Sequence, residues 1–153
     1  MADVKPIPDG YHSVTPYLII KGAAAAIDYY KKAFGAVELF RMDHQGKIGH
    51  AEIKIGDSPI MLADENPDMG YVGPGALGGT PVSLMIYVPD VDATYKTAIT
   101  SGGTELKALQ DWFYGDRSGT LRDPFGHIWT VSTHKEDVTP EEMDKRMAAA
   151  HGG

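Results

Sequence analysis

The chain has 153 residues, of which 42% are hydrophobic and 23% charged, and its formal net charge is -7. This composition is that of an ordinary globular protein with one domain, or with two small halves that share a core, and it excludes a fibrous or wholly disordered chain. The acidic balance also excludes general binding to nucleic acid or to anionic membranes, which requires clustered basic residues.

Cysteine is absent from the sequence. Its absence excludes disulfides, thiolate catalysis and zinc sites built from cysteine, and it agrees with a reducing compartment. The first residues lack the apolar segment of a secretory signal, and no apolar run approaches the ~20 residues that span a bilayer. We therefore expect a cytoplasmic protein with no membrane partner.

Residues 1–65 are predicted to form a first compact module with an N-terminal arm. β-Branched and aromatic residues at 14–20 indicate a strand, and the alanine-rich stretch 23–34 favours a helix that ends at Gly35. The residues spaced to share one face of this helix are Ala24, Ile27, Lys31 and Phe34. Glycine-containing turns separate three further predicted strands, at residues 36–42, 47–55 and 59–63.

The same order of elements recurs in residues 82–134. Residues 66–81 are rich in glycine and proline, show neither a helical nor a strand period, and are expected to be a linker. The elements predicted after it are a strand at 82–88, a helix at 91–101, a strand at 104–107, a loop through Trp112, and strands at 119–123 and 127–133. Residues 135–153 are expected to form a C-terminal helix and tail, opened by the capping box Thr139-Pro140-Glu141-Glu142.

Short sequence matches support an internal duplication. Ala36-Val37-Glu38-Leu39 is similar to Gly103-Thr104-Glu105-Leu106, and glycine follows each of the first two predicted helices. The sequence therefore predicts two copies of a βαβββ unit, which is an α+β chain.

The second copy closes with Asp123-Pro124-Phe125-Gly126-His127-Ile128-Trp129. A duplicated βαβββ unit with this ending resembles the vicinal oxygen chelate superfamily, which includes glyoxalase I, extradiol dioxygenases, fosfomycin-resistance enzymes and bleomycin-resistance proteins. The segments that resemble its PhnB-like branch are Thr15-Pro16-Tyr17-Leu18, Gly49-His50-Ala51-Glu52-Ile53 and Tyr114-Gly115-Asp116-Arg117. The resemblance implies an α+β fold in which curved mixed sheets surround a shared cavity, with helices on the outer faces.

In that superfamily four strand positions, usually His or Glu, hold a divalent metal in the cavity. The motif alignment puts these positions at Thr15, Met61, Ser83 and Thr130. Hydroxyls and a thioether cannot replace the imidazole or carboxylate ligands of zinc, nickel or iron. The resemblance therefore implies a cavity with no metal ligands and no cofactor.

The two-residue period of a strand predicts which side chains share a face with those four positions. The predicted cavity lining is apolar with scattered hydroxyls and comprises Thr15, Tyr17, Met61, Ser83, Met85 and Thr130. In the strand at 47–55, the same period packs Ala51 and Ile53 beneath a helix. His50 and Glu52 then point to the opposite face.

His50 and Glu52 are the candidate catalytic pair. Their i, i+2 spacing on a strand puts an imidazole beside a carboxylate that would fix the tautomer of the ring. An alternative is that both residues lie at a solvated rim and serve solubility alone. A metal site away from the usual positions is a third interpretation, for which the sequence shows no third donor.

Trp112-Phe113-Tyr114 puts three aromatic rings in a predicted loop, where they need to be covered. The functional interpretation is a lid in which Trp112 and Tyr114 stack on a planar or apolar ligand, while Arg117 binds an anion or carboxylate. The structural alternative is that the rings close the end of the barrel and that Asp116 pairs with Arg117. Trp129 is expected in the core, and the histidines other than His50 are expected to be solvated.

The function expected from these residues is binding of a small organic molecule. A metal-free cavity would sequester an apolar or aromatic ligand, as bleomycin-resistance proteins sequester a drug. The alternative is an enzyme, either a metal-dependent lyase or isomerase of the glyoxalase kind or a metal-free catalyst that uses His50 and Glu52 for proton transfer. Because modules of this superfamily commonly pair within or between chains, the resemblance also implies a homodimer.

Overall fold

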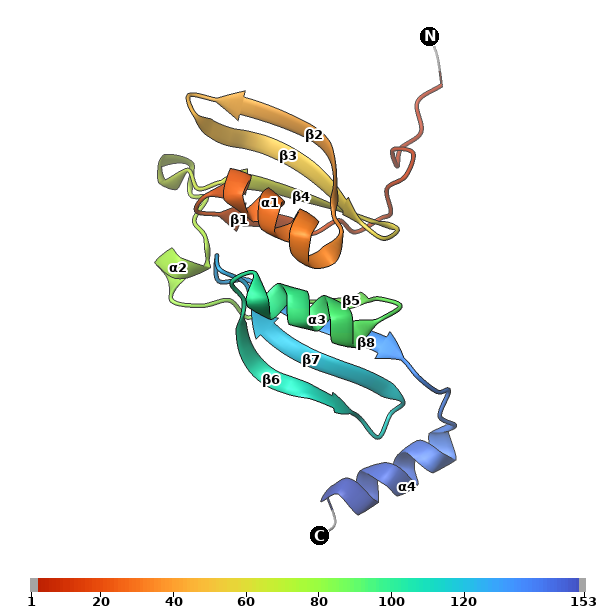
Figure 1. Cartoon of the computed structure of the whole chain (residues 1–153). Coiled ribbons are helices and arrows are strands. Elements are labelled where there is room, and N and C mark those ends of the chain that lie inside the picture. The colour runs from red at the N-terminus through yellow and green to blue at the C-terminus, as the bar shows by residue number, and fades with distance from the viewer. Residues whose placement is uncertain (1–2, 152–153) are drawn as a thin grey trace. The chain divides into compact units, whose positions relative to one another are not determined.

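A computed structural model describes residues 3–151, which divide into two compact units between residues 79 and 80 (Figure 1). Residues 1–2 and 152–153, the outer ends of the predicted N-terminal arm and C-terminal tail, lie outside the described residues. Each unit contains one four-stranded mixed sheet and a helix between its first two strands, which confirms the predicted α+β class. Within residues 3–151, no helix has both the length and the apolar character needed to cross a membrane.

The first unit is a βαβββ module. Its elements are β1 (Tyr17–Ile20), α1 (Ala23–Phe34), β2 (Val37–His44), β3 (Lys47–Ile55) and β4 (Ser58–Asp64). The strands pair in the order β1-β4-β3-β2, with β1 parallel to β4 and the other pairs antiparallel. β1 begins at Tyr17, later than the predicted residue 14. Pro16 has no N–H to donate to the sheet and offers only its carbonyl, which accepts from the Met61 N–H at 3.0 Å.

Helix α1 packs on one face of this sheet, and the core lies between them (Figure 1). Ala51 and Ile53 of β3 are fully buried, as the strand period predicted. The buried residues of the helix are Ala23, Ala26, Ile27, Tyr29, Tyr30, Ala33 and Phe34. Of the four residues predicted to share one face, Ile27 and Phe34 are buried, whereas Ala24 and Lys31 are exposed. The helix turns its tyrosine rings to the sheet instead, because they have far more apolar surface to bury than Ala24.

The second unit repeats this architecture. Its elements are β5 (Ser83–Tyr87), α3 (Val91–Thr100), β6 (Thr104–Asp111), β7 (Asp116–Arg122) and β8 (Ile128–His134), and the strands pair in the order β5-β8-β7-β6. Trp129 is fully buried, as predicted, and its indole N–H donates to Asp123 at 2.9 Å. At Gly119 the sheet has no side chain, which leaves room for the ring of Tyr95 from α3.

The hairpin between β6 and β7 is tighter than the sequence predicted. β6 continues to Asp111 and β7 begins at Asp116, whereas the predicted strands ended at residue 107 and began at residue 119. The Trp112 N–H donates to the Asp116 carbonyl at 2.8 Å, so the three aromatic residues occupy a turn rather than a long loop. Register shifts between Glu105 and Gln110 interrupt the alternation on which the prediction relied.

The last strand of each module caps the first helix of that module. Asp64 accepts hydrogen bonds from the backbone N–H groups of Gly22 and Ala23 at 3.0 and 2.9 Å. Gly22 has no side chain that could cap α1, so the carboxylate of Asp64 satisfies these N–H groups instead. In the second module, the Thr133 hydroxyl accepts from the Val91 N–H at 3.0 Å. The duplication predicted from the sequence therefore extends to helix capping.

Residues 66–79 pack on the first module. They include the 3₁₀ helix η1 (Pro67–Met69) and the short helix α2 (Pro74–Leu77). Glu65 accepts from the Gly73 N–H at 2.9 Å, and a Cβ atom at Gly73 would lie 3.1 Å from the Ile19 carbonyl oxygen. Because residue 73 is glycine, the segment can lie against β1. The stretch expected to be a linker therefore supplies part of the surface of the first module.

Helix α4 (Pro140–His151) follows the second module and begins with the predicted cap, in which the Thr139 hydroxyl accepts from the Glu142 N–H at 3.2 Å. Arg146 donates to the Phe113 carbonyl at 3.1 Å and forms an ion pair with Glu136. None of the residues of α4 is buried. The helix is therefore held at the β6–β7 turn by polar contacts.

Candidate functional site

The open face of the first module, meaning the sheet face opposite α1, carries one side chain from each strand in a single row. Tyr17 of β1 lies beside Met61 of β4, and Glu52 of β3 is the next side chain in register. Phe40 of β2 completes the row next to Glu52. Tyr17 and Phe40 are each 47% exposed, so aromatic rings flank a thioether and a carboxylate on this surface.

His50 and Glu52 are hydrogen-bonded neighbours on this face, as their spacing predicted. His50 Nε2 lies 2.8 Å from Glu52 Oε2, and His50 Nδ1 lies 2.8 Å from the Tyr17 hydroxyl. The Tyr11 hydroxyl donates to the other oxygen of Glu52. The His50 and Glu52 side chains are only 25% and 21% exposed, which distinguishes them from two freely solvated side chains. Tyr17, His50, Glu52 and Tyr11 are called the His50 chain below.

The hydrogen-bonding capacities of these groups fix which atoms donate and which accept along the His50 chain. A carboxylate can only accept, so Glu52 requires the proton of neutral His50 to lie on Nε2. His50 Nδ1 is then an acceptor, and the Tyr17 hydroxyl donates to it. Burial, together with the nearby phenol of Tyr71, raises the pKa of Tyr17, so this hydroxyl keeps its proton at neutral pH. Tyr17 is therefore a protonated, exposed end of the chain.

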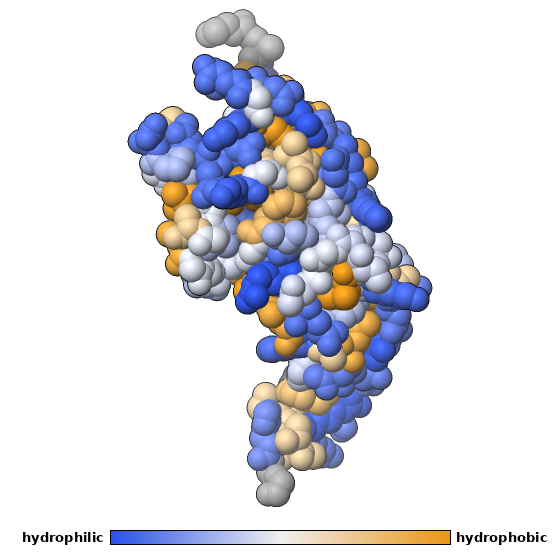
Figure 2. All heavy atoms as spheres, turned by 60° about the vertical axis from the view of Figure 1, so that its left-hand side comes forward, coloured by the Kyte–Doolittle hydropathy of each residue, from blue (hydrophilic) through white to orange (hydrophobic). Residues whose placement is uncertain are grey.

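A pocket of about 750 Å³ opens beside Tyr17 and His50. Ile19, Ile48 and Ala63 supply apolar lining, and the residues after β4 add Met69 and Tyr71 together with charged side chains. The charged lining residues are Lys47, Asp64, Glu65 and Asp68. Figure 2 shows hydrophobic and hydrophilic side chains intermingled over the face that it presents.

Met69 and Tyr71 were not predicted as site residues from the sequence. Both lie in the glycine- and proline-rich segment that shows no helical or strand period, and an aromatic residue in such a segment was the only available signal.

The four positions that hold metal in the superfamily do not fit a divalent cation here. Met61 presents a thioether on the open face, and the Thr130 hydroxyl lies 2.8 Å from the hydroxyl of Thr120, so these two groups satisfy each other. Ser83 is exposed, and Thr15 is half-buried ahead of β1. Such donors bind zinc, nickel or iron poorly. Across residues 3–151, no cluster of three or more His, Asp or Glu side chains is arranged to hold a metal ion.

The remaining residues of the predicted lining lie on the open face of the second module. Met85 is 51% exposed and pairs with Thr130, and Ser83 lies two residues earlier on β5. Of the predicted cavity lining, Tyr17 is the member that lines the 750 Å³ pocket. A ligand-binding role for Thr15, Met61, Ser83, Met85 and Thr130 stays a prediction.

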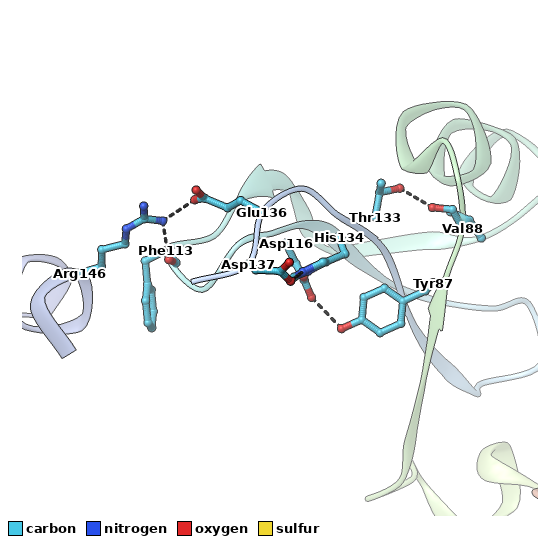
Figure 3. Close-up of polar contacts among 9 residues, drawn as sticks. All are labelled: Tyr87, Val88, Phe113, Asp116, Thr133, His134, Glu136, Asp137 and Arg146. Carbon is cyan, nitrogen blue, oxygen red and sulfur yellow. Dashed lines mark hydrogen bonds and ion pairs between the residues drawn. The ribbon is translucent and has the colours of Figure 1, made fainter. Parts of the chain in front are cut away.

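The second module holds a hydrogen-bonded cluster around a single histidine, His134, which was not predicted from the sequence (Figure 3). The Tyr87 hydroxyl donates to Asp116 at 2.8 Å, and the other oxygen of Asp116 lies 2.7 Å from His134 Nδ1. His134 Nε2 lies 2.8 Å from Asp137. Hydrogen bonds to Asp116 and Asp137 raise the pKa of His134. Tyr87, Asp116, His134 and Asp137 are called the His134 cluster below.

The aromatic residues of the β6–β7 turn contact one another. The rings of Trp112 and Tyr114 are stacked, with centroids 6.1 Å apart and an angle of 13° between their planes. Phe113 meets Tyr114 edge-on at 5.4 Å. All three residues are half-buried, so they cover part of one another's apolar surface. Stacking of Trp112 or Tyr114 on a ligand stays a prediction.

Arg117 does not pair with Asp116, because adjacent residues of β7 point to opposite faces. Its guanidinium reaches α3, where it donates to the two oxygens of Asp92 at 2.8 and 3.1 Å, and it lies 3.5 Å from Asp111. The hydrogen bonds from Arg117 hold the pKa of Asp92 low. A second pocket, of about 700 Å³, includes Trp112 and Arg117 in its lining. An anion at Arg117 would compete with two carboxylates, and that role also stays a prediction.

Known proteins share both the sequence pattern and the fold. The family model of the Glyoxalase/Bleomycin resistance protein/Dioxygenase superfamily matches residues 11–131. The uncharacterized protein Mb0911c of Mycobacterium bovis is 40% identical over 145 residues, which cover 92% of this chain and 95% of that protein. The structure of TioX from Micromonospora sp. ML1 aligns with a TM-score of 0.64 at 26% identity, covering 84% of this chain and 100% of TioX. The PhnB protein from Bacillus cereus has the same fold, with a TM-score of 0.62 at 19% identity and coverage of 80% and 99%.

Proposed function

Because the chain belongs to the glyoxalase, bleomycin resistance protein and dioxygenase superfamily, we propose that it binds a small organic molecule without a metal ion. The proposed site is the pocket beside Tyr17 and His50, and the proposed ligand is apolar or aromatic. The observation that carries this proposal is a pocket of about 750 Å³ with apolar lining and a hydrogen-bonded phenol at its edge.

The size and lining of the pocket support the proposal. Ligand sites in proteins commonly enclose roughly 300–1,000 Å³ and combine apolar and aromatic walls with a few fixed polar groups. Ile19, Ile48 and Ala63 offer apolar surface, while Tyr17 and Tyr71 offer aromatic rings with a polar tip. Such a lining suits a planar or apolar ligand that makes one or two hydrogen bonds.

The polar groups of the pocket are ordered before a ligand arrives. Tyr17 is held by His50, and His50 is held by Glu52. A ligand that meets these groups does not have to order them, which favours tighter binding. These hydrogen bonds support a ligand-binding site at Tyr17, because an exposed sheet face without ordered polar groups would not favour binding in this way.

The fluorescent apolar probe 1-anilinonaphthalene-8-sulfonate tests the proposal. We expect saturable binding of one probe per chain, weakened about tenfold by Tyr17→Ala or Tyr71→Ala, since each removes a ring from the lining. Leu77→Ala is the control, because Leu77 is 69% exposed on α2 and is not part of the pocket lining. Equal binding by all variants would contradict the proposed site.

A metal-free enzyme is the second candidate function, and the hydrogen-bonded pair of His50 and Glu52 favours it. A histidine oriented by a carboxylate can move protons in general acid–base catalysis. The test is turnover of the methylglyoxal–glutathione adduct in the presence of a chelator. Activity that survives chelation and is lost in His50→Ala supports this function, and absence of turnover contradicts glyoxalase chemistry.

We also propose that the protein acts as a homodimer in the cytoplasm, with no nucleic-acid or membrane partner. The support is the net charge of -7, the lack of cysteine and the way in which modules of this superfamily commonly pair. Size-exclusion chromatography with light scattering should give twice the chain mass of 16.5 kDa. A single-chain mass at micromolar concentration would contradict the dimer.

A further inference from the structure

We propose that the first-module pocket selects ligands with an acidic hydroxyl group, phenolic or enolic, whose proton passes to Tyr17 and from Tyr17 to His50. This inference rests on the proposed function, and it adds the chemical class of the ligand and the residue that contacts it. It also changes the role expected for His50. Tyr17 contacts the ligand, and His50 receives the proton that Tyr17 gives up.

The contacts of the His50 chain make Tyr17 the group that meets a ligand. Both ring nitrogens of His50 are already engaged, one by Tyr17 and one by Glu52. Both oxygens of Glu52 are engaged as well, by His50 and Tyr11. Tyr17 is 47% exposed and lines the pocket, whereas Glu52 and Tyr11 are not among the described residues that line it. A ligand therefore reaches the chain through the Tyr17 hydroxyl.

The proton transfer is balanced within these groups. When a ligand hydroxyl binds at the Tyr17 oxygen, its O–H bond breaks and its proton goes to Tyr17. The former proton of Tyr17 moves to His50 Nδ1, which lies 2.8 Å away. The ligand becomes an oxyanion, Tyr17 remains a neutral phenol, and His50 becomes an imidazolium. No oxidant, reductant or further reactant takes part.

The neighbours of His50 stabilise the charges that this transfer creates. The carboxylate of Glu52 lies 2.8 Å from His50 Nε2 and so faces the new imidazolium charge directly. The hydrogen bond from Tyr11 holds that carboxylate in place. The ligand oxyanion keeps the phenol of Tyr17 as a donor. The charged lining of the pocket combines the cation Lys47 with the carboxylates of Asp64, Glu65 and Asp68, so the stabilisation comes from the His50 chain rather than from the charged lining. The site is therefore organised for a ligand that arrives neutral and is bound as an anion.

A ligand without an acidic proton gains less from this site. An ether or ketone can only accept a hydrogen bond, and the Tyr17 hydroxyl must leave His50 to donate to it. The acceptor on His50 Nδ1 would then lose its partner in a half-buried position. The His50 chain consequently distinguishes a phenol from its methyl ether, which occupies almost the same volume.

The probe pair 4-nitrophenol and 4-nitroanisole tests this distinction. Ionised 4-nitrophenol absorbs at longer wavelength than the neutral phenol, and its acidity is close to that of an imidazole. At a pH where free 4-nitrophenol is mostly neutral, we expect addition of the protein to produce the phenolate absorbance band. 4-Nitroanisole, which has no hydroxyl proton, should bind at least tenfold more weakly.

Three variants test whether the phenolate band depends on the His50 chain. Tyr17→Phe keeps the ring and removes only the hydroxyl, and Glu52→Gln removes the charge that faces His50, so each should abolish the phenolate band. Tyr87→Phe is the matched control, because it also removes the hydroxyl of an exposed tyrosine, on the open face of the second module. We expect this control to retain the wild-type band and affinity.

The outcomes separate this inference from the proposed function. If both probes bind with equal affinity and bound 4-nitrophenol keeps its neutral spectrum, the acidic-hydroxyl inference is overturned while the binding function stands. If a phenolate band appears and survives in Tyr17→Phe, the assigned proton path is overturned. If neither probe binds, the result contradicts the inference and the proposed pocket together.

Discussion

At the scale of single residues, the candidate site depends on the position of one proton on His50. Glu52 accepts from His50 Nε2, and this leaves Nδ1 to accept from Tyr17. If the proton moved to Nδ1, His50 would present a donor to Tyr17. Glu52 would then face the lone pair of Nε2 and lose its hydrogen bond. The tautomer therefore determines whether Tyr17 can pass a proton along the chain.

Glu52→Gln tests how the tautomer is held. In the wild type we expect neutral His50 to carry its proton on Nε2, because a carboxylate cannot donate. Glutamine can donate or accept, so the variant should contain both tautomers. The ¹⁵N chemical shifts of the His50 ring, measured at a pH where the ring is neutral, distinguish the two forms. Asp57→Asn in the β3–β4 turn is the control, and a wild-type ring protonated on Nδ1 would contradict the assignment.

Gly119→Ala tests the fit between Tyr95 and the second sheet. A Cβ atom at residue 119 would lie 2.7 Å from the Tyr95 ring. That ring is held in place because the Tyr95 hydroxyl donates to Glu105 at 2.9 Å, with the Lys107 carbonyl oxygen 3.2 Å away. We expect the free energy of unfolding to fall by about 1–3 kcal/mol, as for other overpacked cores. Gly49→Ala is the control, since the nearest atoms to its Cβ are 3.9 Å away. Equal urea midpoints for the two variants would contradict the packing argument.

Only the short-range part of these contacts could be predicted from the sequence. The period of a strand predicted that His50 and Glu52 lie side by side, because they are two residues apart. The Tyr17 and Tyr11 partners lie 33 and 41 residues away, and no local pattern encodes such contacts. The pairing of Asp116 with Arg117 was wrong for a physical reason. These residues belong to a strand, where neighbours point to opposite faces, rather than to a loop.

At the scale of elements, a side chain of the last strand caps the first helix in both modules. Asp64 does this for α1, and its second oxygen accepts from the Ile48 N–H of β3 at 2.7 Å. Thr133 does the same for α3, and its hydroxyl also donates to the Val88 carbonyl at 2.6 Å. Each of these residues ties a helix start to its sheet.

Asp64→Ala tests this capping role. The substitution leaves the N–H groups of Gly22, Ala23 and Ile48 without their acceptor, so we expect the free energy of unfolding to fall by about 2 kcal/mol or more. Urea denaturation measures the change. Asp57→Ala is the control, because the Asp57 side chain lies in an exposed turn and accepts from Ser58 alone among the bonds described for it. If the two variants lose the same stability, the capping role is contradicted.

The His134 cluster predicts a pH dependence for the end of the second module. Contacts with Asp116 and Asp137 raise the pKa of His134 in the folded protein. When the pKa of a histidine is higher in the folded protein than in the unfolded chain, its protonation stabilises the fold. The whole of this contribution is present below the ordinary histidine pKa of about 6.5, and it is lost as the pH rises through the raised pKa. The thermal midpoint of the wild type should therefore exceed that of His134→Gln by most at acidic pH. A difference that grows toward alkaline pH would contradict the prediction.

Most elements could be predicted from periodicity, and the exceptions have identifiable causes. The bounds of α1 and β3 agree with the prediction. An alanine-rich run marks α1, and flanking glycine turns together with the alternation of Ala51, Ile53 and Ile55 mark β3. β6 and β7 were predicted too short, since register shifts in β6 break its alternation and polar residues begin β7. η1 and α2 were missed because each spans a single turn in a segment rich in glycine and proline.

At the scale of the whole molecule, the duplication made the fold predictable and left the function open. Two copies of one element order, with the closing segment 123–129, were enough to indicate the superfamily, and the family match over residues 11–131 confirms it. At the four positions that the resemblance assigns to metal ligands, the sequence has three hydroxyls and a thioether, so metal-free chemistry stays a proposal. The pocket could not be predicted, because part of its lining comes from the segment expected to be a linker.

Native mass spectrometry of the protein, purified from cells without a chelator, distinguishes metal-free ligand binding from a metal-dependent site. We expect the folded chain to carry an organic molecule of a few hundred daltons and no stoichiometric metal ion, because the pocket includes apolar and aromatic lining and the four positions assigned to metal ligands offer poor donors. One nickel, zinc, manganese or iron ion per chain would contradict the account.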